Sequence, residues 1–291
     1  MPKRCRRAYC NRDRGVNSIL LGKATSSSTF TNTRPRTLSS TMSLYYVYMR
    51  WLRKTDERSG SWARQLLTCE SRYVADEFFR ACQDLKDNRG QPRFTKLERS
   101  TPQFWIYDTT DSEPWNALVD ILCKSPLPAS VEGRVMSTLL HDGVGREWPV
   151  APVAAGRDWV NGNTYFVRNI RQPNLYWFDD GSNPGILYIS NGGNKTKFRV
   201  VGTDMGSVKR VLIRSEVVRL EIPQSGNSPT RHLLCDYNNR LVCASGGGGW
   251  TFKFGDLLGR FGTRFIGKNQ LGIYGAVTWG EGNDPDEWEL C

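Results

Sequence analysis

The stretch TYFVRNIRQPNLYWFDDGSNPGILYISNGGNKTKFRV, residues 164–200, sets the pattern of the C-terminal half of the chain. Short runs of aromatic and β-branched residues alternate here with clusters of Gly, Asn, Asp and Pro, which is typical of strands joined by turns. The same texture continues to residue 291 without a pattern typical of a helix. We therefore predict that residues 158–291 form one all-β module, either a sandwich or a barrel.

Three weakly similar units can be laid over one another within this module, each with an opening strand, a middle hairpin and a closing strand. The opening strands are predicted at residues 165–169, 211–215 and 264–268. The closing strands are predicted at residues 197–200, 251–254 and 287–290. The clearest hairpin joins residues 175–178 to residues 186–189. A short unit can bury one apolar stripe only against copies of itself, so three units would close a barrel around equivalent core residues, Phe198, Phe252 and Trp288.

This arrangement resembles the β-trefoil superfamily, for residues 158–291 only, and within it the ricin-B-like lectins and the mycocypin-like protease inhibitors. The resemblance implies a binding module that acts through loops on a rigid barrel. Ricin-B-like lectins carry Gln-x-Trp near the end of each repeat. The corresponding places here read TKF at 196–198, GWT at 249–251 and DEW at 286–288, a departure that argues against galactose binding of the ricin type.

A small α+β domain is predicted upstream, at residues 42–125. Strands are expected at residues 45–52, 64–69, 94–97 and 104–107. A helix capped by Ser71 should follow the second strand, and another should span residues 114–123. The proline-containing residues 126–157 are predicted to be a linker, with a short helix at 131–140. The predicted fold class is mainly β, a small α+β domain followed by a β-trefoil-like barrel.

The charge of the chain is concentrated at its N-terminus. The net charge is +11, but residues 1–41 carry nine basic residues and one acidic residue, which leaves +3 for the remainder. We expect residues 1–41 to be a disordered basic tail. The remainder is close to neutral, which argues against a nucleic-acid partner except through this tail. The sequence contains no run of about 18 apolar residues, so no membrane span is predicted. The expected location is the cytoplasm, or mitochondria if the tail is a transit peptide.

Few residues are available for catalysis or metal binding. His141 and His232 are the only histidines, and the eight cysteines have no C-x-x-C spacing, so we expect free thiols, no metal and no cofactor. His232 and Cys235 are three positions apart in an expected strand and should face opposite sides. Residues 262–268 match the start of a phosphate-binding loop, but Asn269 stands where Ser or Thr is required. An enzymatic alternative would use the acids Asp108, Asp111 and Glu113.

Two predicted turns place a tryptophan beside carboxylates and an amide, at residues 177–183 and 279–284. A saccharide needs such a set, because its C–H face stacks on a ring while its hydroxyls form hydrogen bonds with the polar groups. Turns also require Asp, Asn and Gly for backbone reasons alone. The predicted ligand-binding residues are Trp177, Asp179, Asp180, Asn183, Trp279, Glu281, Asn283 and Asp284.

These observations lead to two functional hypotheses. The first is a non-enzymatic binding protein, lectin-like, whose partner is a glycan or a protein held by the loops of the C-terminal module. The second is a protease inhibitor or interaction module that inserts an exposed loop into a partner, with residues 223–229 or 283–286 as candidate loops.

Overall fold

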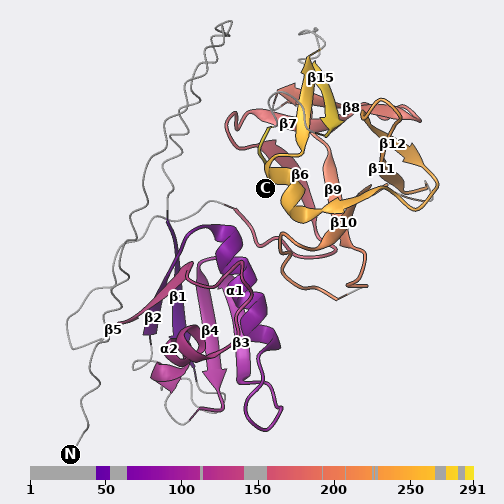
Figure 1. Cartoon of the computed structure of the whole chain (residues 1–291). Coiled ribbons are helices and arrows are strands. Elements are labelled where there is room, and N and C mark those ends of the chain that lie inside the picture. Colours follow the sequence, from indigo (N-terminus) through magenta and orange to yellow (C-terminus); the bar gives the residue numbers. More distant parts are fainter. Residues whose placement is uncertain are drawn as a thin grey trace, which may run out of the picture. The chain divides into compact units, whose positions relative to one another are not determined.

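The computed structural model describes residues 44–52, 64–111, 114–140, 156–191, 193–206, 208–224, 226, 229–265, 273–280 and 286–291. Residues 42–291 belong to one compact unit. Its described part is mainly β and consists of a small α+β domain followed by a closed barrel of seven strands (Figure 1). This confirms the predicted α+β domain and β barrel. The predicted basic tail, residues 1–41, lies outside the described residues.

The α+β domain is built on a five-stranded sheet. Its strands are β1 (Tyr45–Trp51), β2 (Arg64–Cys69), β3 (Phe94–Thr101), β4 (Phe104–Thr109) and β5 (Val135–Leu140), in the spatial order β3-β4-β1-β2-β5. The β1–β4 pair is parallel and the other pairs are antiparallel. Two helices, α1 (Arg72–Asp84) and α2 (Pro114–Lys124), complete the described part of the domain.

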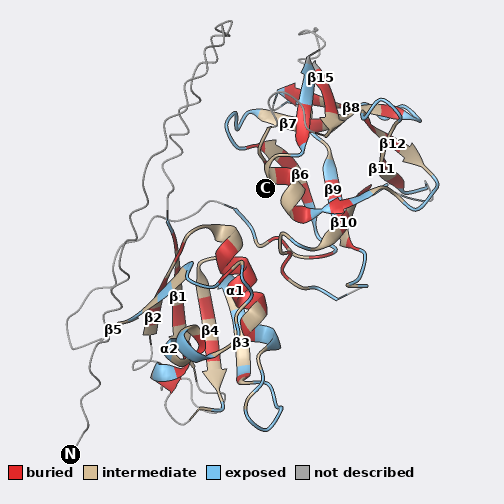
Figure 2. Ribbon diagram, in the orientation of Figure 1, coloured by how far each residue is buried: buried red, intermediate tan, exposed pale blue. Residues whose placement is uncertain are grey.

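The cap of α1 is the one that the sequence predicts. The hydroxyl of Ser71 accepts a hydrogen bond from the amide of Val74 at 3.4 Å, which satisfies one of the unpaired amides of the first turn. The apolar face of α1, with Val74, Phe78 and Cys82, is buried in the core of the α+β domain (Figure 2). Amphipathic spacing and a capping residue were therefore sufficient to locate this helix.

The helix predicted at residues 131–140 is wrong. Residues 135–140 form β5, which pairs antiparallel with β2 from Val135↔Cys69 to Leu140↔Arg64. The side chains at 135 and 137 are half-buried while those at 136 and 138 are exposed, which is the period of a strand. The free edge of β2 supplies hydrogen-bond partners along the whole of β5, so part of the predicted linker belongs to the first sheet.

The barrel closes through a ring of antiparallel pairings in the order β6-β7-β8-β12-β11-β10-β9 and back to β6. The seven strands are β6 (Thr164–Asn169), β7 (Leu175–Asp179), β8 (Gly185–Asn191), β9 (Lys197–Gly202), β10 (Val217–Ile222), β11 (Arg231–Cys235) and β12 (Leu241–Ser245). Four further strands and a short 3₁₀ helix extend this ring. They are β13 (Thr251–Lys253), η2 (Phe254–Leu258), β14 (Phe261–Phe265), β15 (Ile273–Trp279) and β16 (Trp288–Leu290).

The predicted hairpin and closing strands are present, but two opening strands are displaced. The strand expected at 211–215 is wrong, because β10 begins at Val217. The preceding residues form a turn in which the carboxylate of Glu216 accepts a hydrogen bond from the amide of Ile213 at 2.9 Å. The strand expected at 264–268 begins earlier, at Phe261, and residues 266–268 lie outside the described residues.

The barrel core is aromatic. Phe198 and Trp288 are fully buried and Phe252 is 5% exposed, so the three residues predicted to anchor the core are buried. The ring of Trp177 lies edge-on to both Phe198 and Trp288, with centroid separations of 6.1 and 5.6 Å. Rings in such T-shaped contacts contribute packing energy beyond the burial of their area.

A set of buried charges joins α1 and β3 to the segments that flank the barrel. Arg99 contacts Asp76 at 2.6 Å and Asp158 at 2.8 Å, and its side chain is 3% exposed. The guanidinium of Arg72 lies 3.8 Å from the ring centre of Trp159. Because a charge taken out of water must be paired, separating these partners would leave buried charges uncompensated.

Replacing Trp288 by Ala should lower the free energy of unfolding by about 3–5 kcal/mol, because it removes a fully buried ring from the aromatic core. Equilibrium urea unfolding of the full chain measures this change. Met136, which is 59% exposed on β5, provides the control, and Met136→Ala should stay within about 0.5 kcal/mol of the parent. Equal losses in the two variants would contradict the assignment of the core.

The ion pairs of the chain should differ in strength according to their burial. Arg99→Ala removes the cation of Asp158 and the nearer cation of the buried Asp76, which keeps Arg72 at 3.7 Å, and should cost about 3–5 kcal/mol. The matched control is Lys124→Ala, which breaks an ion pair with Asp120 whose side chains are 74% and 40% exposed, and it should cost less than about 1 kcal/mol. A loss below about 1 kcal/mol for Arg99→Ala would show that the buried charges are not structural.

Candidate ligand-binding surfaces

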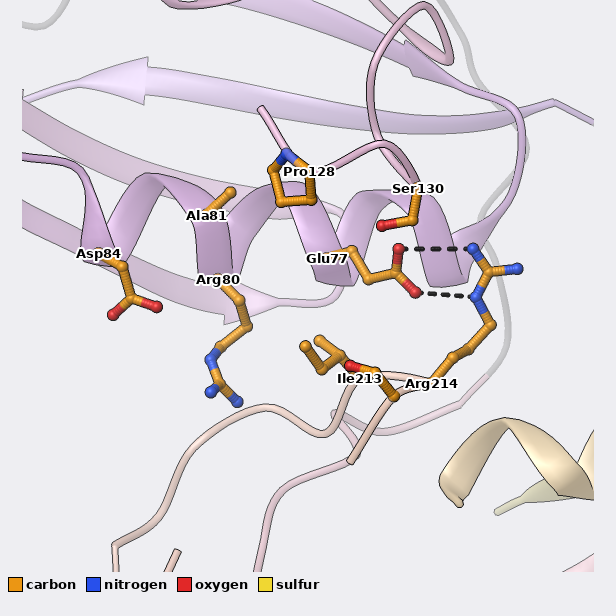
Figure 3. Close-up of a pocket in the computed structure, with 9 residues that line it drawn as sticks. Glu77, Arg80, Ala81, Asp84, Pro128, Ser130, Ile213 and Arg214 are labelled. Atoms are coloured by element: carbon orange, nitrogen blue, oxygen red, sulfur yellow. Dashed lines mark hydrogen bonds and ion pairs between the residues drawn. The ribbon is translucent and has the colours of Figure 1, made fainter. Parts of the chain in front are cut away.

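The pocket beside α1 has a volume of about 460 Å³ and is lined by charged side chains (Figure 3). Glu77 accepts two hydrogen bonds from Arg214, at 2.8 and 3.4 Å, across the pocket. Arg80 donates to the carbonyl of Val211 at 2.6 Å and to Glu216 at 2.7 Å. Glu77 and Arg80 are therefore engaged in contacts that fasten α1 to the 211–216 turn.

A second pocket, of about 450 Å³, lies beside α2 and contains one of the acids of the enzymatic alternative. Asp111 forms an ion pair with Arg93 at 3.0 Å and accepts a hydrogen bond from Thr109 at 2.7 Å. Asp108 accepts a hydrogen bond from the indole of Trp51 at 3.0 Å. Glu113 lies outside the described residues. The two described acids thus have structural partners, and their arrangement offers no acid–base pair.

Trp177 is not available to a ligand. Its side chain is 0% exposed and lies in the barrel core, in contact with Phe198, Phe261 and Trp288. The prediction that its ring stacks on a saccharide is therefore wrong. Successive residues of a strand face opposite sides, and β7 has aromatic residues at 176, 177 and 178, so the sequence alone did not show which ring points inward.

Asp179 points to the same side of β7 as Trp177 and is buried with it. Its side chain is 4% exposed and forms an ion pair with the guanidinium of Arg231, which is also buried. Arg231 further donates to the carbonyl of Cys243 at 2.9 Å. Asp179 therefore serves the barrel interior and cannot meet a saccharide.

Asp180 and Asn183 remain on the surface, in the turn between β7 and β8. Asp180 accepts a hydrogen bond from the amide of Ser182 at 2.9 Å, and Asn183 accepts one from the amide of Ser245 at 3.1 Å. Both residues are exposed, but the ring that was to accompany them is in the core. The structure therefore does not bring together the first predicted site.

Trp279 is half-buried at the end of β15. One side of its indole packs against Trp250 and Phe261, with centroid separations of 4.7 and 5.0 Å. The other predicted residues of this loop, Glu281, Asn283 and Asp284, lie outside the described residues, as does most of the candidate inhibitory loop at 283–286. The loop at 223–229 is described only in part.

The turn between β11 and β12 lies against Trp279 and was not singled out in the sequence. The amide of Trp279 donates to the carbonyl of Asn239 at 2.8 Å, and Thr278 forms a β-bridge with Arg240. Tyr237, in the same turn, is 93% exposed. The sequence signal for this residue is the stretch DYNNR at 236–240, in which turn-forming residues flank a tyrosine.

The carboxylate of Asp236 closes this turn. It accepts hydrogen bonds from the amides of Asn238 and Arg240, both at 2.8 Å, and from the guanidinium of Arg240 at 2.9 Å. Partial desolvation raises the pKa of Asp236, but the hydrogen bonds from Arg240 and Asn238 outweigh it and lower the pKa below the usual value of 3.8. The backbone that carries Tyr237 is therefore fixed at neutral pH.

Two of the described cysteines, Cys235 and Cys69, are poorly suited to act as nucleophiles. Cys235 donates only a weak hydrogen bond, to the carbonyl of Asp236 at 3.8 Å, and burial raises its pKa. Burial also raises the pKa of Cys69 to about 12. A thiol with a raised pKa stays protonated near neutral pH and is a poor nucleophile. His141 lies outside the described residues.

Among the residues that the structure describes, no group of three or more His, Cys, Asp or Glu side chains is arranged to hold a metal ion. None of the described helices combines the length and the apolar character that crossing a membrane requires.

A comparison with models of known protein families finds no match, and no curated protein is significantly similar to this chain.

The turn around Asp236 should respond to acid. A carboxyl group whose pKa is lowered in the folded state contributes stability above its unfolded pKa and loses that contribution as the pH falls through the folded pKa. The amide resonances of Asn238 and Arg240 should therefore shift at a pH below 3.8 in an NMR titration. The Asp236→Asn variant should show no such transition, and a midpoint above 3.8 in the parent would contradict the assigned hydrogen bonds.

Proposed function

We propose that this chain is a non-enzymatic binding protein and that its C-terminal barrel holds a saccharide against the ring of Tyr237. The observation that carries the proposal is the 93% exposure of Tyr237 on a turn whose backbone is closed by Asp236. An aromatic ring held in water on a rigid turn has little conformational entropy to lose when a ligand covers it. Sugar C–H faces are the natural partners of such a ring.

Polar groups next to the ring support a hydroxylated ligand. Asn238 and Asn239 are both exposed, and an amide can donate and accept hydrogen bonds at the same time, as vicinal hydroxyls require. Asn239 has a positive φ of 58°, a conformation that asparagine tolerates better than most residues. The backbone amide of Trp279 donates to the carbonyl of Asn239 and so supports the same turn, while the indole of Trp279 packs against Trp250 and Phe261.

We further propose that the module is trefoil-like, with three hairpins that pack together and carry the binding residues on their turns. The second strands of three hairpins contact one another, because β8 pairs with both β12 and β15, and Arg240 of the β11–β12 turn forms a bridge with Thr278 of β15. A binding residue on a hairpin turn is then supported by the two neighbouring hairpins. This support favours turns as ligand sites, since binding residues work best on loops held by a rigid scaffold.

We propose a non-enzymatic role because the side chains that could act as acids, bases or nucleophiles form structural contacts. The described acids Asp108, Asp111, Asp179 and Asp236 all accept hydrogen bonds within the fold, and burial raises the pKa of Cys235. Groups that are tied in this way hold the backbone and are poorly placed for proton transfer.

The test is a glycan-array screen of the full chain and of Tyr237→Ala. We expect binding to a restricted set of neutral glycans, reduced about tenfold or more in the variant, since stacking on one ring is worth on the order of 1 kcal/mol or more. Tyr237→Phe should retain most of the affinity because it keeps the ring.

Met136→Ala, on the exposed side of β5, is the control for a surface substitution and should bind as the parent does. Thermal unfolding of all variants shows whether they are folded. Absence of binding by a folded parent, or equal binding by the parent and Tyr237→Ala, would refute the proposal.

A further inference from the structure

A second group of surface side chains lies on β6, on β7 and at the start of β9, and is called here the lysine–aromatic cluster: Phe166, Tyr176, Lys197 and, in the turn just before β9, Lys195. Phe166 is opposite Lys197 in the β6–β9 pair, and Tyr176 is opposite Arg168 in the β6–β7 pair. The rings of Phe166 and Tyr176 are 6.3 Å apart and nearly perpendicular. The strand register therefore brings together residues from three separate segments of the chain (Figure 1).

Both lysines point at the rings. The Nζ atom of Lys195 lies 4.5 Å from the ring centre of Phe166 and 5.1 Å from that of Tyr176, and Nζ of Lys197 lies 5.4 Å from that of Phe166. Because both Nζ atoms are close to the ring of Phe166, they are at most about 10 Å apart. Two neighbouring anionic groups of one ligand can each reach one of the ammonium groups.

The charge of the cluster is not neutralised within the described residues. Neither Lys195 nor Lys197 forms an ion pair with a described carboxylate, whereas the two adjacent arginines do, Arg168 with Glu289 and Arg171 with Glu287. The positive excess is thus confined to the two lysines. On a surface where both signs of charge are mixed, a cation usually has an acidic side chain nearby. Two neighbouring lysines without such a partner are available to an anionic ligand.

The cluster is also held in place before any ligand arrives. The amide of Thr196, between the two lysines, donates to the carbonyl of Trp177 at 3.0 Å, and the amide of Asp179 donates to the hydroxyl of Thr196 at 2.9 Å. The rings attract the ammonium groups and so restrict the long lysine side chains. Less side-chain entropy is then lost when a ligand binds.

We propose that the lysine–aromatic cluster binds an acidic saccharide, with sulfate or carboxylate substituents at Lys195 and Lys197. This inference rests on the proposed function for the nature of the ligand, but it concerns different residues. Asn174 and Asn191, both exposed, are within hydrogen-bonding distance of each other at 3.4 Å, and Asn174 is two positions from Tyr176. Their amides can bind the hydroxyls of the same sugar.

A single-stranded nucleic acid fits the cluster less well. Such a ligand needs a continuous basic groove along the backbone and free ring faces for its bases. Here the two rings are approached by ammonium groups, and the arginines nearest to them in the sequence are already paired, Arg168 with Glu289 and Arg171 with Glu287. Two ammonium groups at one place suit isolated anionic substituents of a sugar better than a chain of phosphates.

The experiment is calorimetric titration of the full chain with a sulfated oligosaccharide, the same oligosaccharide after desulfation, and a single-stranded oligonucleotide of similar charge. We expect the sulfated sugar to bind with the highest affinity, and the affinity to fall about tenfold for each of Lys195→Ala and Lys197→Ala. Binding should also weaken as NaCl is raised from about 0.05 M to about 0.5 M.

Lys209→Ala and Lys253→Ala remove exposed lysines outside the cluster and are the matched controls, which should bind as the parent does. Equal losses in these controls would mean that only the net charge matters, and would overturn the assignment. Tighter binding of the oligonucleotide would overturn the saccharide as ligand, and equal affinity for the desulfated sugar would overturn the role of the anion.

Tyr237→Ala separates this inference from the proposed function. It should weaken the binding of neutral glycans about tenfold or more and leave the binding of the sulfated sugar unchanged. The double variant Lys195→Ala, Lys197→Ala should weaken the binding of the sulfated sugar and leave that of neutral glycans unchanged. Loss of both activities in either folded variant would show that a single site exists and would overturn the second one.

Discussion

The structure of the barrel depends on the burial of the Trp177 ring. The indole meets Phe198, Phe261 and Trp288 edge-on, at centroid separations of 5.1–6.1 Å, and these partners belong to β9, β14 and β16. Segments that are distant in the sequence are thus collected around one side chain. Because interiors are close-packed, a ring of this size fixes the positions of its neighbours as well as being held by them.

The inward position of Trp177 determines what happens on both sides of β7. Asp179, two residues further along the strand, must also point inward. A buried carboxylate needs a partner, and Arg231 forms an ion pair with it. One residue earlier, Tyr176 must point outward, where it meets Phe166 and Lys195. The buried ion pair and the surface cluster are therefore consequences of one strand register.

The α+β domain is joined to this barrel by charge and aromatic contacts together. Arg99 links Asp76 to Asp158, while Tyr73 packs on Trp159 at 5.0 Å between ring centres. Neighbouring Arg80 and Arg214 continue the contacts along α1 (Figure 3). The charged side chains of this junction thus form ion pairs with one another.

The sequence by itself determined the local features of this protein. Alternating residues located the β7–β8 hairpin and the closing strands, and Ser71 with its amphipathic segment located α1, because period and capping depend only on neighbouring residues. Only the tertiary structure decided which of the consecutive aromatic residues of β7 is buried, because either face of Tyr176-Trp177-Phe178 is apolar and the choice is made by Phe198 and Trp288. It also made β5 a strand, because the edge of β2 was open. The exposure of Tyr237 and the meeting of Lys195 with Phe166 depend in the same way on pairings between distant segments, which no local pattern encodes.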